Sequence, residues 1–161
     1  MNNPEENVDS REHGMTARPL MVADVMTQHV ITLSPHHSFY DAMSLIAKRS
    51  FRHFLVVDEG RKLVGVVSDR DILRVLARTT NWNTTSISQF MACDVFTVTS
   101  DTKLSVAVDK MLSRRINCLP VIDGESNLLG IVTSTDLLKA FRSAQESWEA
   151  QANSLNSVIK R

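Results

Sequence analysis

The chain has 161 residues, enough for one compact core or for two small units that share one. Lys and Arg together number 18, as do Asp and Glu, so the formal net charge at pH 7 is zero. This balance excludes the clustered basic excess typical of nucleic-acid and anionic-membrane surfaces. No apolar stretch reaches transmembrane length, and residues 1–11 lack the order of a signal peptide. We therefore expect a cytoplasmic protein with no nucleic acid and no membrane as partner.

The chain opens with residues 1–19, a polar segment that we expect to be flexible because it has few apolar side chains to bury. A first structural unit follows over residues 20–78. Its β-rich run at 30–33 precedes a helix predicted over 38–49, where apolar side chains recur at helical spacing. Two apolar strands joined by a polar turn come next, and a last helix opens at Ser68.

The rest of the chain repeats this unit. Residues 22–73 align with residues 87–138 at a constant offset of 65 and without a gap, and where identity fails the apolar character is mostly kept. The polar segment 79–86 between the copies is expected to be a linker. A unit of about 55 residues is marginal alone, so the two copies are expected to share a core.

The second unit, residues 87–142, has the same order of elements. A β-rich run at 95–98 leads to a helix predicted over 102–114, then to two strands and a helix that opens at Thr133. The tail, residues 143–161, continues that helix and is a candidate for partner or dimer contact. The predicted fold class is α/β, a mixed α+β arrangement of two β-α-β-β-α repeats packed sheet to sheet with pseudo-twofold symmetry.

Several motifs carry a resemblance to a known family. They are the D-V-M opening, the strands F-L-V-V-D and L-P-V-I-D, and above all G-V-V-S-D-R-D at 65–71 and G-I-V-T-S-T-D at 130–136. Through them, residues 20–142 resemble the CBS (cystathionine beta-synthase) domain family, in which two repeats form a Bateman module. The resemblance implies two clefts between the repeats. In many relatives these clefts hold AMP, ADP, ATP, S-adenosylmethionine or a related adenosyl ligand, and two modules pair into a flat disc.

The last of these motifs suits a nucleotide chemically. Thr133 stands at a strand-to-helix turn, where free backbone N–H groups and a hydroxyl favour a phosphate. Asp136 comes one turn later, and its two carboxylate oxygens match the two hydroxyl donors of a ribose. The same S/T-x-x-D spacing also resembles a helix capping box, which needs no ligand. The two roles can coexist.

The family pattern assigns partners to each cleft, with the strand-to-helix motif of one repeat facing the first strand of the other. Apolar side chains would hold the purine while nearby backbone groups recognise its edge. One cleft would then contain Thr133, Asp136, Thr27, Val30 and Ile31, and the other Ser68, Asp71, Ala92, Val95 and Phe96.

The two copies differ in charge just before their second strand. The first copy has Arg52 and His53 there, whereas the second has Asn117 and Cys118. By the family correspondence, Arg52 and His53 would face the Thr133/Asp136 cleft and bind phosphate, and Arg70 would serve the other cleft. The alternative is that the two arginines are solvated surface charges and His53 a half-buried polar residue.

The function expected from these features is a regulatory module that binds an adenine nucleotide (AMP, ADP or ATP) and signals to a separate effector protein. A homodimer of modules is expected, and no cofactor is obligatory. Sensors of S-adenosylmethionine, NAD or another adenosyl ligand are alternatives, as is a dimerisation module with empty clefts. An intact ribose carboxylate in each copy argues against the last of these.

Catalysis and metal binding have little support in the sequence. No G-x-S-x-G, H-E-x-x-H, Walker or G-x-G-x-x-G motif is present, so the chain is predicted not to be an enzyme. The pair His36-His37 has no Cys, Asp or Glu at zinc-ligand spacing around it. The two cysteines, Cys93 and Cys118, are expected to be small buried hydrophobic side chains.

Overall fold

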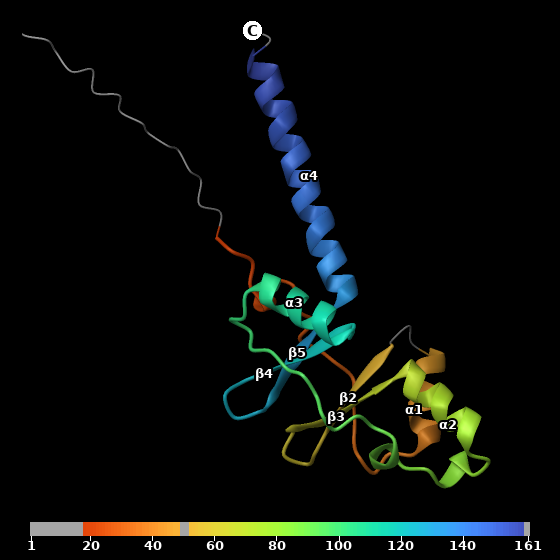
Figure 1. Ribbon diagram of the computed structural model, residues 1–161. Helices are drawn as coiled ribbons and strands as arrows, with labels where there is room; N and C mark the ends of the chain where they lie inside the picture. The colour runs from red at the N-terminus through yellow and green to blue at the C-terminus, as the bar shows by residue number, and fades with distance from the viewer. Residues whose placement is uncertain (1–17, 49–51, 160–161) are drawn as a thin grey trace, which may run out of the picture.

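The computed structural model describes residues 18–48 and 52–159, so the expected flexible segment 1–19 lies almost wholly outside the described residues. Two similar units are joined side by side (Figure 1). The first contains β1 (Thr32–Leu33), α1 (Phe39–Lys48), β2 (His53–Val57), β3 (Leu63–Ser68) and α2 (Asp69–Arg78). The second contains α3 (Leu104–Arg114), β4 (Cys118–Ile122), β5 (Leu128–Thr133) and α4 (Ser134–Ile159). Short 3-10 turns lie at η1 (Val22–Asp24), η2 (Trp82–Thr84) and η3 (Ile87–Gln89).

In the first repeat, α1 and α2 pack on a three-stranded sheet in the order β1-β2-β3. β1 runs parallel to β2, and β2 runs antiparallel to β3. The fully buried rings of Phe39 and Phe54 lie in the core between the helices and the sheet, because apolar residues on α1 and β2 point to the same side. Trp82 of the linker covers Phe39, with the ring centroids 6.1 Å apart.

The second repeat lacks the strand expected over residues 95–98. β4 and β5 form an antiparallel pair, and of the residues expected in that strand Val98 alone adds to it, through a single parallel bridge to Val121. The Val98 N–H donates to the carbonyl of Pro120 at 3.1 Å, and the Ile122 N–H donates to the carbonyl of Val98 at 3.0 Å. The residues just before Val98 contact their own repeat without strand pairing, since Phe96 packs on its core and the Thr97 carbonyl accepts from Lys110 Nζ at 2.9 Å.

The segment that leads into each repeat crosses in this way. The Thr27 N–H donates to the Ile131 carbonyl at 2.9 Å and its carbonyl accepts from the Ile131 N–H at the same distance. Ala92 makes the corresponding pair with Val66, at 2.9 and 3.0 Å. These pairs explain why β1 begins only at Thr32 and not at residue 30. Both partners of the first pair lie 65 residues from their counterparts in the second, as pseudo-twofold symmetry requires.

The crossing also exchanges core residues between the repeats. Val22 of η1 is fully buried in the core of the second repeat, and Ile87 of η3 is fully buried in the core of the first. Each leading segment therefore completes its neighbour's core. This exchange could not be predicted from the sequence, because the periodicity of apolar residues does not show which of two cores a residue joins.

The two sheets meet through a third apolar cluster, built on Leu55, Cys118 and Ile131. This contact confirms the predicted mixed fold of two repeats packed sheet to sheet. Cys118 is buried as expected, but Cys93 is exposed, so the prediction for Cys93 was wrong. Cys93 lies in the turn just after Ala92, where the chain leaves the inter-repeat bridge without reaching a core.

The last helix is unlike its counterpart. α4 spans 26 residues and includes most of the predicted tail, whereas α2 ends after 10 residues. Figure 1 shows α4 leaving the two repeats and projecting away from them. Within the described residues, no helix is both long and apolar enough to cross a membrane.

Candidate functional site

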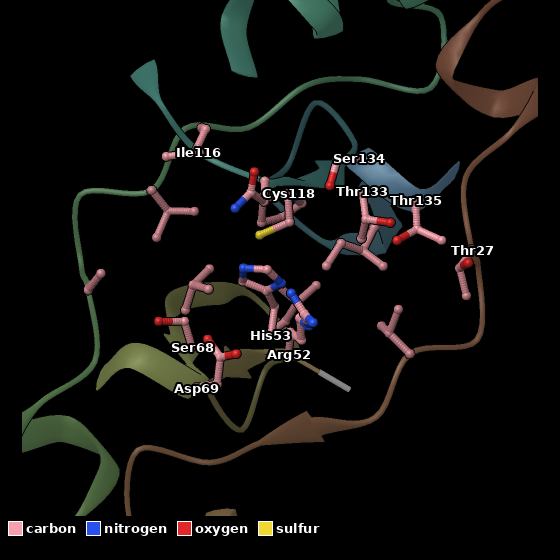
Figure 2. Close-up of a pocket in the computed structure, with 18 of the residues that line it drawn as sticks. Thr27, Arg52, His53, Ser68, Asp69, Ile116, Cys118, Thr133, Ser134 and Thr135 are labelled. Atoms are coloured by element: carbon pink, nitrogen blue, oxygen red, sulfur yellow. The ribbon is translucent and has the colours of Figure 1, made fainter. Parts of the chain in front are cut away.

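A cavity of about 760 Å³ lies between the repeats and draws its walls from both. All thirteen residues predicted for the two clefts line it, so the structure brings the two sets together around one continuous space. They are Thr27, Val30, Ile31, Arg52, His53, Ser68, Arg70, Asp71, Ala92, Val95, Phe96, Thr133 and Asp136. Thr27, Thr133, Ser134 and Thr135 gather at one end, Ser68 and Asp69 lie at the other, and His53 and Arg52 lie between them (Figure 2).

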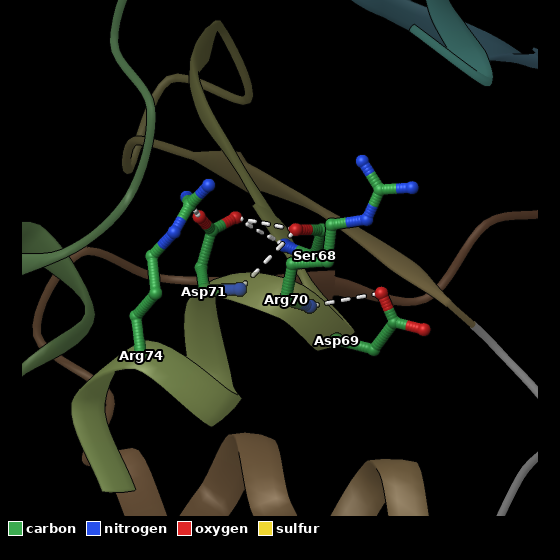
Figure 3. A network of polar contacts seen from close by, with 5 residues as sticks. All are labelled: Ser68, Asp69, Arg70, Asp71 and Arg74. Atoms are coloured by element: carbon green, nitrogen blue, oxygen red, sulfur yellow. Dashed lines mark hydrogen bonds and ion pairs between the residues drawn. The ribbon is translucent and has the colours of Figure 1, made fainter. Parts of the chain in front are cut away.

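At the first-repeat end, Asp71 is engaged on both carboxylate oxygens (Figure 3). Its Oδ2 accepts from the Ser68 N–H at 2.9 Å and from the Ser68 hydroxyl at 2.6 Å, which completes a capping box at the start of α2. Its Oδ1 accepts from Arg74 Nη1 at 2.8 Å. Beside this network, the Arg70 N–H donates to Asp69 Oδ1 at 2.9 Å.

At the second-repeat end, Asp136 makes the same capping contacts but keeps its other oxygen more open. Oδ2 accepts from the Thr133 N–H at 2.9 Å and from the Thr133 hydroxyl at 2.7 Å. Oδ1 has only Lys139 Nζ near it, at 3.9 Å, which is beyond hydrogen-bond length. Asp136 is 8% exposed and is the one charged residue in the buried core of the described chain. The capping role is therefore present, and it leaves a carboxylate oxygen available to a ligand.

Two glycines permit the close approach that forms the ends of the cavity. A Cβ at Gly130 would lie 2.5 Å from the Thr27 carbonyl oxygen, and a Cβ at Gly65 would lie 2.7 Å from the Met91 sulfur. The backbone contact at Gly130 could not be relieved without moving the chain, whereas at Gly65 the flexible Met91 side chain could shift. Each glycine thus allows the leading segment of the other repeat to pair with its strand and to bring Thr27 or Ala92 to the cavity.

The basic residues of the first copy lie in the middle of the cavity. The His53 imidazole points from β2 toward Cys118 of the other repeat, with Arg52 beside it (Figure 2). Partial burial lowers the pKa of His53 below its usual 6.5, the negative charges of Asp69 and Asp71 oppose that shift, and Arg52 and Arg70 add to it. His53 is therefore mostly neutral at pH 7. An anion bound beside it would favour the protonated imidazolium form.

The cavity contains basic and polar groups that the sequence analysis missed. His29, Arg115 and Lys139 line it, so the second repeat also supplies cations to the cavity, through Arg115 and Lys139, despite Asn117 and Cys118. Lys139 was detectable, since it follows Asp136 by three residues on a helix. Arg115 was not, because it ends α3 in the left-handed region (φ 54°), a position that usually selects glycine.

Nucleophilic and metal chemistry find little support at this site. Burial raises the pKa of the Cys118 thiol to about 12, so the thiol remains protonated and unreactive at neutral pH. Among the residues that the structure describes, no group of three His, Cys, Asp or Glu side chains could hold a metal ion. The cavity is lined instead by four carboxylates, several hydroxyls and several cations beside apolar side chains.

A family model for the CBS domain matches this chain twice, over residues 22–78 and 87–143. The chain belongs to the CBS domain family. The CBS pair is 31% identical over 121 residues to L-aspartate semialdehyde sulfurtransferase of Methanocaldococcus jannaschii. That match covers 75% of this chain but only 23% of the relative's length.

Solved structures of other CBS pairs have the same fold. The CBS domain pair of protein MJ0100 in complex with 5′-methylthioadenosine and S-adenosyl-L-methionine superposes with a TM-score of 0.72 at 30% identity, covering 79% of this chain and 99% of that one. CBSX2 in complex with AMP superposes with a TM-score of 0.71 at 28% identity, covering 78% and 98%. Both of these neighbours bind adenosyl compounds.

Proposed function

We propose that this CBS pair binds an adenine nucleotide, AMP, ADP or ATP, in the cavity between its repeats as a regulatory ligand. The observation that carries the proposal is Asp136, a nearly buried carboxylate that lines the cavity and whose Oδ1, among the described residues, has an ion-pair contact with Lys139 at 3.9 Å but no hydrogen bond. A buried carboxylate with an open oxygen suits a ribose diol, which offers two hydroxyl donors.

The remaining groups then divide by chemistry. Val30 and Ile31 border the cavity beside Thr27 and provide an apolar surface for the purine ring. The hydroxyls of Thr133, Ser134 and Thr135 surround the first turn of α4, where free backbone N–H groups favour an anion. In this proposal Arg52 and His53 bind the phosphates from the centre of the cavity, as the sequence analysis expected.

S-adenosylmethionine is the second candidate ligand, favoured by the likeness to the pair of protein MJ0100. It uses the same ribose carboxylate but presents a sulfonium in place of phosphate. The cavity lining holds four aspartates (Asp69, Asp71, Asp94 and Asp136) as well as four Arg and Lys side chains, so its net charge does not separate the two ligands. Arg52 and His53 at the centre of the cavity (Figure 2) suit a phosphate and not a sulfonium, and for this reason a phosphorylated ligand remains the first candidate.

The proposed output is regulation of a separate protein and not catalysis. The Cys118 thiol that lines the cavity is protonated, and Asp71 and Asp136 are engaged in helix caps, so neither a nucleophile nor a free general base is evident among these groups. Nucleotide binding would draw the two repeats together because both supply walls to the cavity. A partner that contacts both repeats would detect that change.

We also propose that two modules pair through their helices. Large apolar side chains stand exposed on the helices of both repeats, and apolar surface of this kind often marks an interface. They are Tyr40, Leu73 and Leu76 on the first repeat and Val106, Leu112, Leu138 and Phe141 on the second. Light scattering should return a dimer at micromolar concentration, and a monomer with and without nucleotide would contradict this.

A thermal-shift panel tests the ligand proposal. Adenosine, AMP, ADP, ATP and S-adenosylmethionine are compared at equal concentrations, with GTP as the control for a phosphate chain on another base. A ligand that binds only the folded state raises the melting temperature. The adenine nucleotides should raise it most. No shift with any adenosyl compound would favour a dimerisation module whose cavity stays empty.

A further inference from the structure

The apolar stripe of α4 begins inside the module and continues beyond it. Leu137 packs on the core of the second repeat. Leu137, Phe141 and Ala144 also line a shallow apolar groove of about 390 Å³ with Leu20 and Val108. Ala144 is the last α4 residue that lines this groove, and Figure 1 shows the later part of the helix with neither repeat beside it. The module therefore covers the stripe only at its start.

Beyond that point the stripe follows a seven-residue repeat. Phe141, Trp148 and Leu155 are spaced by seven, and Leu137, Ala144, Gln151 and Val158 occupy the intermediate positions of the same repeat. We call these seven positions the α4 seam. Phe141 is 58% exposed and Trp148 is 62% exposed. A seven-residue repeat is the spacing at which one helix pairs along another, so the missing cover is itself a helix.

The charges of this stretch lie off the seam. Between residues 141 and 159 the charged side chains are Arg142, Glu146 and Glu149, and all three occupy the face of the repeat opposite the seam. Arg142 and Glu146 pair with one another along the helix at 3.7 Å. Because the seam itself carries no charged side chain, two copies of it can meet without bringing like charges together. A helix that binds an oppositely charged partner would instead carry charges of one sign along its contact face, and two such faces would repel each other.

The helix also needs a partner for its own stability. Residues 143–159 include four Ser and two Asn, which have modest helix propensity. An isolated helix of about 15 residues is marginal in water even with favourable residues. Packing along the seam supplies the stabilisation that propensity does not.

We propose that the α4 seam pairs with the α4 seam of a second copy of this chain. Such an interface is self-complementary, because each chain contributes the same surface about a twofold axis. It is additional to the pairing of helical faces proposed above, since most of the seam, from Trp148 onward, lies beyond that surface, and the two share only Phe141. It does not depend on the identity of the ligand.

Trp148 fluorescence tests this pairing directly. In a Trp82→Phe background Trp148 is the only tryptophan, and its quenching by acrylamide reports whether the seam is covered. Quenching should fall several-fold as the protein concentration rises through the range in which pairs form. Leu155→Glu, one repeat away on the seam, should restore full quenching at every concentration. The matched control, Asn153→Glu, adds the same charge on the opposite face and should change nothing.

The proposal is overturned if Trp148 stays fully quenchable in the purified protein up to high micromolar concentration, which would mean that a different protein covers the seam. It is equally overturned if Leu155→Glu and Asn153→Glu behave alike. A thermal shift with nucleotide, measured on the same variants, should be unchanged by either substitution. The ligand proposal and the seam proposal can therefore fail separately.

Discussion

Arg74 Nη1 lies 2.8 Å from Oδ1 of Asp71, whereas Lys139, the counterpart of Arg74, stands 3.9 Å from the equivalent oxygen of Asp136. Both carboxylates cap their helices through the other oxygen. The pseudo-twofold symmetry of the fold therefore does not extend to the two ends of the cavity. One carboxylate is closed by a guanidinium and the other is open.

This difference predicts that adenosine binds at a single end of the cavity. Wild-type protein should bind one equivalent, at Asp136, and Arg74→Ala should allow a second equivalent to bind at Asp71. The second site should be weak, because removing Arg74 frees only one oxygen of Asp71 while the other stays bound in the helix cap. The substitution should cost little stability, since the ion pair is exposed. Calorimetry gives the stoichiometry. Lys139→Ala is the control, and two equivalents in the wild type would show that Arg74 closes nothing.

Arg52→Ala should separate phosphate binding from adenosine binding. The guanidinium stays charged at any relevant pH and presents a planar fork to phosphate oxygens, so its removal should weaken ATP and ADP far more than adenosine. Lys62→Ala, which removes an exposed cation from the β2–β3 turn outside the cavity, is the matched control. An equal loss for adenosine and ATP would identify Arg52 as a surface charge.

His53 should make the stability of the free protein depend on pH. Partial burial holds the pKa of His53 in the folded chain below 6.5, its usual value in an unfolded chain. At a pH between the folded and the unfolded pKa, the unfolded chain therefore binds more protons than the folded one. The free energy of unfolding should therefore be highest above pH 6.5 and should decrease as the pH falls below that value. Melting curves of wild type and His53→Gln between pH 7.5 and 5 check this. The variant should show a smaller decline, while His36→Gln, outside the cavity, should follow the wild type.

Gly130→Ala should both destabilise the fold and weaken ligand binding. The added Cβ would lie 2.5 Å from the Thr27 carbonyl oxygen and would separate the leading segment from β5. Overpacking of this kind typically costs about 1–3 kcal/mol. Gly124→Ala is the control, because nothing lies within 4 Å of its added Cβ. Chemical denaturation gives the free energies of unfolding. Equal stability of Gly130→Ala and Gly124→Ala would contradict the close approach of the Thr27 carbonyl to Gly130.

Much of the arrangement was predictable from the sequence because it depends on local patterns. The 65-residue offset identifies the duplication, and helical spacing in the first copy predicts α1 to within a residue or two of Phe39–Lys48. The thirteen proposed cavity residues came from motifs whose partners the family resemblance supplied. Their roles in binding remain predictions.

What could not be predicted depends on long-range contacts. No local pattern records the pairing of Ala92 with Val66 of the other repeat, and of the strand expected at 95–98 only Val98 pairs with a neighbouring strand. The exchange of Val22 and Ile87 between cores is hidden for the same reason. The openness of Asp136 depends on where Lys139 points, which two similar S/T-x-x-D motifs do not distinguish.

The measurement closest to the central claim is a calorimetric titration of ATP into wild type, Asp136→Asn and Asp71→Asn. Asn keeps an acceptor for the helix cap but loses the charge that a ribose diol prefers. Asp136→Asn should lower the affinity roughly ten- to a hundredfold, the loss expected for a charge-assisted hydrogen bond of about 1.5–3 kcal/mol. Asp71→Asn should leave the affinity nearly unchanged. Wild-type affinity in Asp136→Asn, or no binding by the wild type, would contradict the account.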